Sequence, residues 1–340
     1  MSIAVVGVDL GGTKVAAAPL REGRLGESVV RPTSATDGPA LVDELVAVVQ
    51  EAAAGRLDAV GVGVPSVVEF ETGRVISSVN VPLADVPLRQ VLGERLGVPV
   101  FVDNDATVAA LAEAHDEALR PVTRHLVMLT VGTGIGGGLV LDGRIYRGSS
   151  GGAGELGHTL VGLDLSGPVP PPVSFPQPGS LESVASGHGL DRMGAEAAER
   201  EPDSELGRLR ARGLPVLGSE VVAAARDGDA AALQTLGIWG EHVGVGVANA
   251  INTFDPDEVV IGGGGALAGE LLLEPVRRVA RGYVLPGLAG RAAIRVARHG
   301  IRAGVLGAAM LAIHEVEPLR EAALDGATTE TITERTGGVE

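Results

Sequence analysis

The chain has 340 residues, 45% of them hydrophobic and 21% charged, which is enough to bury the cores of about two domains. Its net charge of −16 argues against a nucleic-acid partner, and the absence of cysteine excludes disulfides, thiol nucleophiles and cysteine zinc sites. The longest apolar runs are too short to span a membrane and the N-terminus lacks the cationic segment of a signal peptide, so we expect a cytoplasmic protein without a membrane partner.

The N-terminal residues predict a β-hairpin with a glycine-rich tip. Residues 3–9 and 14–20 are apolar, β-rich runs separated by a short turn. Glycines in the turn let backbone N–H groups approach phosphate oxygens, and Asp9 could hold Mg²⁺ through water. The alternative is a tight turn in which Asp9 only caps a strand end. The candidate phosphate loop comprises Asp9, Gly11, Gly12, Thr13 and Lys14, the last being the only lysine of the chain.

The rest of the first half alternates helices and strands. Helical spacing over 39–54 precedes a buried strand over 59–64, and a short strand over 100–102 leads into an alanine-rich helix over 106–119. Pro121 then interrupts the pattern, and we predict a domain boundary there.

Three polar residues lie where the strand over 100–102 meets its helix. Asp105 is placed to accept a hydroxyl proton, and the adjacent Asn104 amide can hold that hydroxyl in line for attack. The alternative is an N-cap cluster, which Asp103, Asn104 and Asp105 would favour in any helix.

The second half begins with the same pattern as the first. A strand over 126–131, a glycine–threonine turn over 132–138 and a strand over 139–141 follow the first hairpin by about 120 residues. Two such hairpins predict two related α/β halves, each with a phosphate loop. In the second loop the candidate residues are Gly132, Thr133 and Gly134.

Toward the C-terminus a further glycine run follows a predicted strand. A proline-rich loop over 167–179 and a long helical region over 220–252 precede the strand over 258–261. The glycines over 262–265 permit close approach of a base or ribose before a helix over 269–281. We expect a final helix over 303–316 and a flexible tail over 317–340.

Two carboxylates and an imidazole flank the proline-rich loop. Glu155, His158 and Glu182 could bind sugar hydroxyls, since carboxylates accept hydrogen bonds from vicinal hydroxyl groups. Solvated loop charges are the alternative interpretation.

Together these motifs resemble the ROK (repressor, open reading frame, kinase) family. The order and spacing of 9–14, 104–106, 132–138, 154–158 and 179–182, followed by 261–265, carry the resemblance, which covers about residues 3–315. It implies an α/β fold of two ribonuclease H-like domains of the actin–hexokinase ATPase superfamily with an interdomain cleft. The domains would be a small one over 1–120, joined by the helix over 303–316, and a larger one over 121–302.

Carried over position by position, the resemblance implies ATP-dependent phosphorylation of a hexose. Asp105 would be the catalytic base, and the two loops would bind ATP with Mg²⁺ held by Asp9 through water. Gly263 and Gly264 would border the adenosine. Sugar hydroxyls would be bound by Asn80, Asn104, Asp105, Glu155, His158 and Glu182.

The chain departs from the family at its structural zinc. The family typically combines a histidine, where His158 stands, with three cysteines, and here those positions correspond to Val173, Phe175 and Ser180. None can replace a thiolate, so we expect no zinc.

Glucose is the default substrate, but fructose, mannose or an N-acetylated hexosamine would present a similar ring of hydroxyls. The alternatives to a kinase are a non-catalytic sugar-binding protein and a sugar-responsive regulator. A regulator would carry an N-terminal helix-turn-helix, whereas the first phosphate loop begins nine residues from the N-terminus. The resemblance also favours a homodimer.

Overall fold

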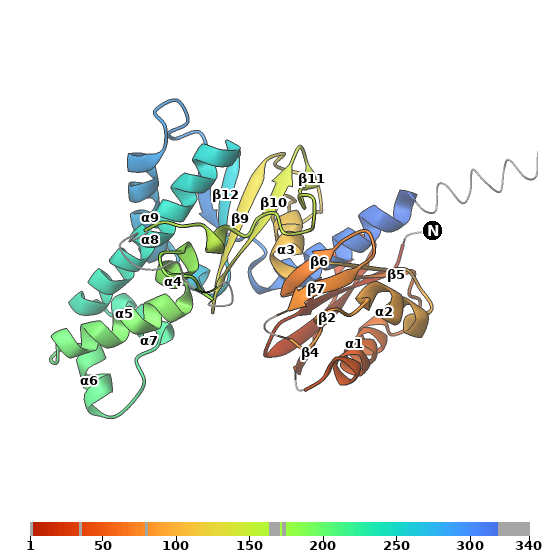
Figure 1. Ribbon diagram of the computed structural model, residues 1–340, viewed down its shortest axis with the longest axis horizontal. Coiled ribbons are helices and arrows are strands. Elements are labelled where there is room, and N and C mark those ends of the chain that lie inside the picture. The colour runs from red at the N-terminus through yellow and green to blue at the C-terminus, as the bar shows by residue number, and fades with distance from the viewer. Residues whose placement is uncertain (1–2, 34–35, 79–80, 163–170, 172–174, 319–340) are drawn as a thin grey trace, which may run out of the picture. The chain divides into compact units, whose positions relative to one another are not determined.

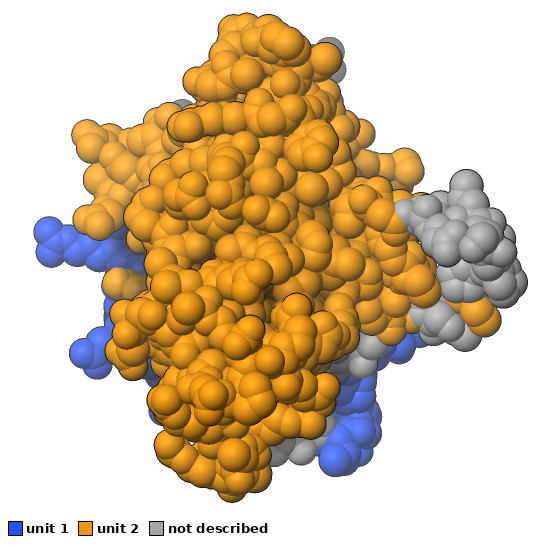
Figure 2. All heavy atoms as spheres, turned by 90° about the vertical axis from the view of Figure 1, so that its left-hand side faces the viewer, with its two compact units in different colours: residues 1–112, 304–340 blue, residues 113–303 orange. Residues whose placement is uncertain are grey.

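The computed structural model describes residues 3–33, 36–78, 81–162, 171 and 175–318, and they form two α/β units (Figure 1). Unit 1 comprises Met1–Ala112 and Gly304–Glu340, and unit 2 comprises Glu113–Ala303 (Figure 2). The sequence places the boundary near Pro121, eight residues after the point at which the units divide. The helix over 303–318 belongs to unit 1 from Gly304 onward.

Unit 1 is built on a mixed sheet of order β3-β2-β1-β5-β8, with β4 also paired to β2. Strands β1, β5 and β8 are parallel, and β1–β2 is the predicted hairpin. The strands are β1 (Val5–Leu10), β2 (Lys14–Arg21), β3 (Arg24–Leu25), β4 (Val29–Pro32), β5 (Ala59–Val64) and β8 (Val100–Asn104). A separate two-stranded sheet pairs β6 (Ser66–Glu69) with β7 (Arg74–Ser78).

Helices cover both faces of this sheet. Because side chains alternate along a strand, Val6 and Val8 pack with the apolar face of α1 (Gly38–Ala53), while Gly7 faces the opposite side. There the final helix packs directly on the strand backbone: a Cβ added at Gly7 would lie 2.1 Å from the Val305 carbonyl oxygen. The other helices of this unit are α2 (Leu88–Leu96) and α3 (Asp105–Glu113).

Unit 2 repeats the same strand arrangement. Its sheet has the order β11-β10-β9-β12-β13, with β9, β12 and β13 parallel and β9–β10 forming a hairpin. This confirms the repeated pattern predicted from the two hairpins. The strands are β9 (Leu126–Val131), β10 (Ile135–Leu141), β11 (Arg144–Ile145), β12 (Glu258–Gly262) and β13 (Ala293–Val296).

The helices of unit 2 pack around a buried tryptophan. Trp239 is 1% exposed, and its Nε1 donates to the Ser186 carbonyl oxygen at 3.0 Å. The α-helices are α4 (Leu181–Ala185), α5 (Gly187–Arg200), α6 (Glu205–Ala211), α7 (Gly218–Arg226), α8 (Ala230–Phe254) and α9 (Glu270–Tyr283), and the 3₁₀ turns are η1 (Leu156–His158), η2 (Gly264–Ala268) and η3 (Gly300–Arg302).

Three predicted elements differ from the structure. The helix expected to reach 119 ends at Glu113, because the Asp116 carboxylate accepts from the Ala118 and Arg120 backbone N–H groups and closes a turn. The helical region over 220–252 is two helices, with Asp229 as the N-cap of α8. The glycines of 136–138 lie in β10, so the turn spans only 132–134.

None of the helices in the described part of the chain combines the length and apolar character that a membrane span requires. Of the tail predicted over 317–340, residues 317 and 318 are helical, and 319–340 lie outside the described residues.

Candidate active site

The first candidate loop closes the β1–β2 hairpin of unit 1. Gly11 N–H donates to the Lys14 carbonyl oxygen at 2.8 Å, and the Thr33 hydroxyl donates to the Gly11 carbonyl oxygen at 2.9 Å. Gly12, Thr13 and Lys14 are exposed, so the tip is accessible to a ligand. Thr33 was not among the predicted residues, since a single threonine beyond the hairpin carries no distinguishing pattern.

Asp9 lies just before this loop, at the end of β1. Burial raises the pKa of its carboxyl from 3.8 to about 6, and the positive charge of Lys14 opposes that shift. The helix over 303–318 approaches it closely, because a Cβ added at Gly304 would lie 2.5 Å from the Asp9 carboxylate. A carboxylate oxygen is a suitable magnesium ligand, so the residue present fits the predicted Mg²⁺ role.

Asn104 and Asp105 lie at the same edge of the sheet as Asp9. The register places Asp9 beside Gly63 of β5, and Gly63 beside Asp103 of β8. These parallel strands all end at that edge, about 4.8 Å apart from neighbour to neighbour. The structure therefore brings the first loop and the predicted base together within unit 1.

The Asn104 side chain caps helix α3. Its Oδ1 accepts from the backbone N–H of Ala106 at 2.9 Å and of Thr107 at 3.1 Å, while its Nδ2 donates to the Ser66 carbonyl oxygen at 3.3 Å. The Asp105 Oδ1 accepts from Ala106 N–H at 2.8 Å. Both oxygens are thus oriented by backbone N–H groups at the N-terminus of α3.

The second candidate loop closes the β9–β10 hairpin of unit 2. Gly132 N–H donates to the Gly134 carbonyl oxygen at 2.9 Å, and Gly187 N–H at the start of α5 donates to the Gly132 carbonyl oxygen at 2.7 Å. A Cβ added at Gly132 would have no atom within 4 Å, so the backbone there is open to a ligand. Thr133 is exposed at the tip.

Glu182 of α4 contacts this loop, which the sequence did not reveal. Its Oε2 accepts from Ile135 N–H at 2.7 Å, and a Cβ added at Gly134 would lie 2.4 Å from the same oxygen. The Glu182 carboxylate therefore lies directly against Gly134, and a side chain at that position would displace it.

The glycine run after β12 lies beside the same loop. Gly263 has φ +75°, and a Cβ added there would lie 2.4 Å from the Val131 carbonyl oxygen. A Cβ added at Gly264 would meet nothing within 4 Å. The open backbone at Gly264 and Gly132 fits a nucleotide that approaches the main chain closely.

Glu155 and His158 form a pair at η1. Their Oε2 and Nε2 atoms are 3.6 Å apart. Burial raises the pKa of Glu155, the His158 charge opposes the shift, and the negative charge of Glu182 adds to it. The structure thus brings Glu155, His158 and Glu182 into one electrostatic neighbourhood within unit 2. Asn80 lies outside the described residues.

The residues at the family's zinc positions do not fit a zinc ion. The Phe175 ring meets the His158 imidazole edge-on, with centroids 5.4 Å apart, and the Ser180 hydroxyl accepts from Ser183 N–H to cap α4. Val173 lies outside the described residues. Elsewhere in the described residues no three His, Asp or Glu side chains converge as metal ligands.

Comparison with known proteins decides the family. The ROK family model matches residues 5–315. The chain belongs to the ROK family. It is 35% identical over 314 residues to a glucokinase of Halalkalibacterium halodurans, covering 90% of this chain and 94% of that one.

Solved ROK structures share its fold. A ROK family glucokinase from Streptomyces griseus, in complex with glucose and AMPPNP, matches with a TM-score of 0.78 and 31% identity over 92% of this chain and 99% of that chain. A ROK hexokinase from Thermus thermophilus matches with a TM-score of 0.71 and 36% identity over 93% and 100%. The predicted family and the two-domain α/β fold class are therefore confirmed.

Proposed function

We propose that this chain phosphorylates a hexose, glucose by default, by transferring the γ-phosphoryl group of ATP to the 6-hydroxyl. Its glucokinase-like place in the ROK family makes it an ATP-dependent sugar kinase. One observation carries the mechanism: Asp105 begins α3 at the edge of the sheet where the first phosphate loop also lies. A carboxylate in that position can accept the hydroxyl proton as the hydroxyl attacks.

The residues of unit 1 have separate roles in this proposal. Asp105 would accept the proton at one carboxylate oxygen, and the Asn104 amide would hold the same hydroxyl. The exposed N–H groups and hydroxyl of the first loop orient phosphate oxygens. Asp9 would hold Mg²⁺ through water, and that ion would supply neutralisation of phosphate charge.

The residues of unit 2 would bind the rest of the two substrates. Gly132, Thr133 and Gly134 present backbone N–H groups to phosphates, and Gly263 and Gly264 leave room for the adenosine. Sugar hydroxyls would donate hydrogen bonds to Glu155, His158 and Glu182, since carboxylates accept hydrogen bonds from vicinal hydroxyl groups. Glu182 also accepts from the backbone N–H of Ile135, the residue that directly follows this loop.

Asp105→Asn tests the proposal. The amide keeps the shape of the side chain but cannot accept a proton, so kcat should fall about 10²–10⁴-fold while glucose binding by calorimetry persists. Asp37→Asn is a matched control, because Asp37 is the N-cap of α1 and its carboxylate accepts from Ala40 N–H at 2.8 Å. A near-normal kcat in Asp105→Asn would show that Asp105 is not the general base.

A coupled ADP-release assay across a hexose panel identifies the sugar. The hexose with the highest kcat/KM is the substrate. Hexose binding without ADP release for any member of the panel would instead support a non-catalytic sugar-binding protein.

A further inference from the structure

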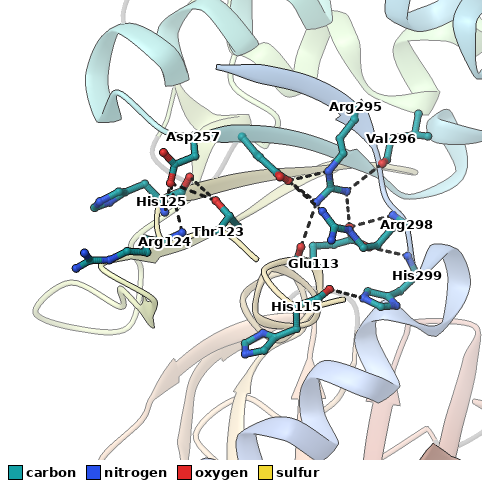
Figure 3. Close-up of polar contacts among 11 residues, drawn as sticks. Glu113, His115, Thr123, Arg124, His125, Asp257, Arg295, Val296, Arg298 and His299 are labelled. Carbon is teal, nitrogen blue, oxygen red and sulfur yellow. Dashed lines mark hydrogen bonds and ion pairs between the residues drawn. The ribbon is translucent and has the colours of Figure 1, made fainter. Parts of the chain in front are cut away.

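A buried carboxylate occupies the C-terminal end of α3. The Glu113 side chain is 0% exposed, and burial of a charge is costly unless it is paired and hydrogen-bonded. Here its Oε2 accepts from Arg295 Nη1 at 2.6 Å and from Arg298 N–H at 2.9 Å, while its Oε1 accepts from His299 N–H at 2.8 Å (Figure 3). The carboxylate is therefore fully paired.

A second carboxylate completes the group, which we call the Glu113 cluster: Glu113, Glu258, Arg295 and Arg298. The Glu258 Oε2 accepts from Arg295 Nε at 2.7 Å and from Arg298 Nη2 at 3.3 Å. Arg295 also donates from Nη2 to the Glu113 carbonyl oxygen at 3.1 Å. The Arg295 guanidinium thus donates to both the side chain and the backbone of Glu113 at the end of α3. Lysine cannot reproduce this geometry.

The imidazole of His299 adds one more contact to the same end of the chain. Its Nε2 lies 3.0 Å from the His115 carbonyl oxygen, two residues beyond α3 (Figure 3). The residues after β13 therefore hold the end of α3 and the turn that follows it.

Helix α3 connects this cluster to the catalytic carboxylate. Asp105 is its first residue and Glu113 its last, so eight steps of 1.5 Å place the two about 12 Å apart on one helix. Glu113 is grouped with unit 2 by its contacts, whereas the other residues of α3 belong to unit 1. A short helix clamped at one end cannot slide or rotate without moving its other end.

We propose that Glu113 is a positioning residue for Asp105, because the cluster that holds one end of α3 sets where the other end presents the carboxylate. The inference rests on the proposed function, in which Asp105 is the general base. Proton transfer and in-line attack are sensitive to displacements of about 1 Å, which can cost about 10²-fold in rate. Glu113 touches no substrate in this scheme, so its loss acts on the rate and not on substrate affinity.

A double-mutant cycle tests the inference. Glu113→Gln keeps the volume but removes the charge that both arginines pair with. We expect its kcat to fall about 10- to 100-fold, with the KM values for ATP and glucose changed by less than about 3-fold. In an Asp105→Asn background the same substitution should cost no further rate, because the base it positions is already absent.

Asp257→Asn is the matched control. The Asp257 Oδ2 accepts from His125 N–H at 3.0 Å and from Arg124 N–H at 3.3 Å, so it anchors the loop before β9 rather than α3 (Figure 3). This variant should lose stability but keep kcat. Arg295→Lys is a milder second variant, which retains the charge and loses the fork, and it decides the question if Glu113→Gln does not fold.

Two results would overturn the inference. One is a wild-type kcat in both Glu113→Gln and Arg295→Lys. The other is that Glu113→Gln lowers kcat by the same factor in the wild type and in the Asp105→Asn background. Failure of the proposed function would give a different result. The Asp105→Asn variant would then keep near-normal kcat, whichever residue stands at position 113.

Discussion

Replacement of Asp9 by asparagine should stabilise the free protein while it removes activity. Burial raises the pKa of Asp9 from 3.8 to about 6, against the opposing charge of Lys14. The folded chain therefore binds this proton more tightly than the unfolded chain, and stability falls as the pH rises from about 4 to about 6. Each pKa unit corresponds to about 1.36 kcal/mol, so ionised Asp9 lowers the free energy of unfolding by about 3 kcal/mol at pH 7.5. Asp9→Asn carries no charge and avoids that cost.

Urea denaturation at two pH values measures this effect. The variant should exceed the wild type by about 3 kcal/mol at pH 7.5 and by about 1.5 kcal/mol at pH 5. Circular dichroism should follow the transition, because the only tryptophan, Trp239, lies in unit 2 and Asp9 lies in unit 1.

Asp257→Asn provides a control of opposite sign. Burial raises the pKa of Asp257, but hydrogen bonds from His125, Arg124 and Thr123 outweigh that effect and lower it. This carboxylate therefore stabilises the protein at neutral pH, and the stabilisation is lost as the pH falls. If Asp9→Asn were less stable than the wild type at pH 7.5, or if the difference were equal at both pH values, burial would not control the protonation of Asp9.

Three glycine substitutions extend these tests. Gly307→Ala would place a Cβ 1.7 Å from the Val108 carbonyl oxygen and should lower the free energy of unfolding by about 3 kcal/mol, whereas Gly237→Ala on α8, where a Cβ meets nothing within 4 Å, should raise it by about 0.5–1 kcal/mol. Urea denaturation compares the two, and a stable Gly307→Ala variant would contradict the close helix packing. Gly134→Ala would place a Cβ 2.4 Å from the Glu182 carboxylate and should raise the KM for ATP about 10-fold through loss of a charge-assisted hydrogen bond. An unchanged KM in steady-state kinetics would exclude this contact from ATP binding.

The hairpins and their loops could be predicted because the relevant pattern is local. Apolar runs on either side of a glycine turn indicate two paired strands, and the same pattern occurs again after Leu126. The polar residues at 103–105 could be found for the same reason, since they stand between a strand and a helix. Both interpretations of Asn104 could be stated from the sequence, and its capping bonds to α3 exist only in the folded chain.

The Glu113 cluster could not be predicted from the sequence. A glutamate in an alanine-rich helix is typical of a solvent-exposed face, and nothing near position 113 indicates burial. Its partners Arg295 and Arg298 lie more than 180 residues later. The early end of α3 was missed for a related reason, because the competing turn at Asp116 depends on side-chain hydrogen bonds to the backbone.

The discontinuity of unit 1 has a consequence for synthesis on the ribosome. Residues 113–303 form one continuous unit, but the sheet of the first 112 residues receives its covering helix only after residue 304 is translated. At ~5–20 residues per second the N-terminal segment waits roughly 10 to 40 s with the backbone at Gly7 and Gly61 uncovered. The second unit can therefore complete its folding before the first. A ribosome that stalls after residue 303 but before the last helix has been made leaves a chain in which unit 2 is complete and the sheet of unit 1 has one uncovered face, to which chaperones can bind.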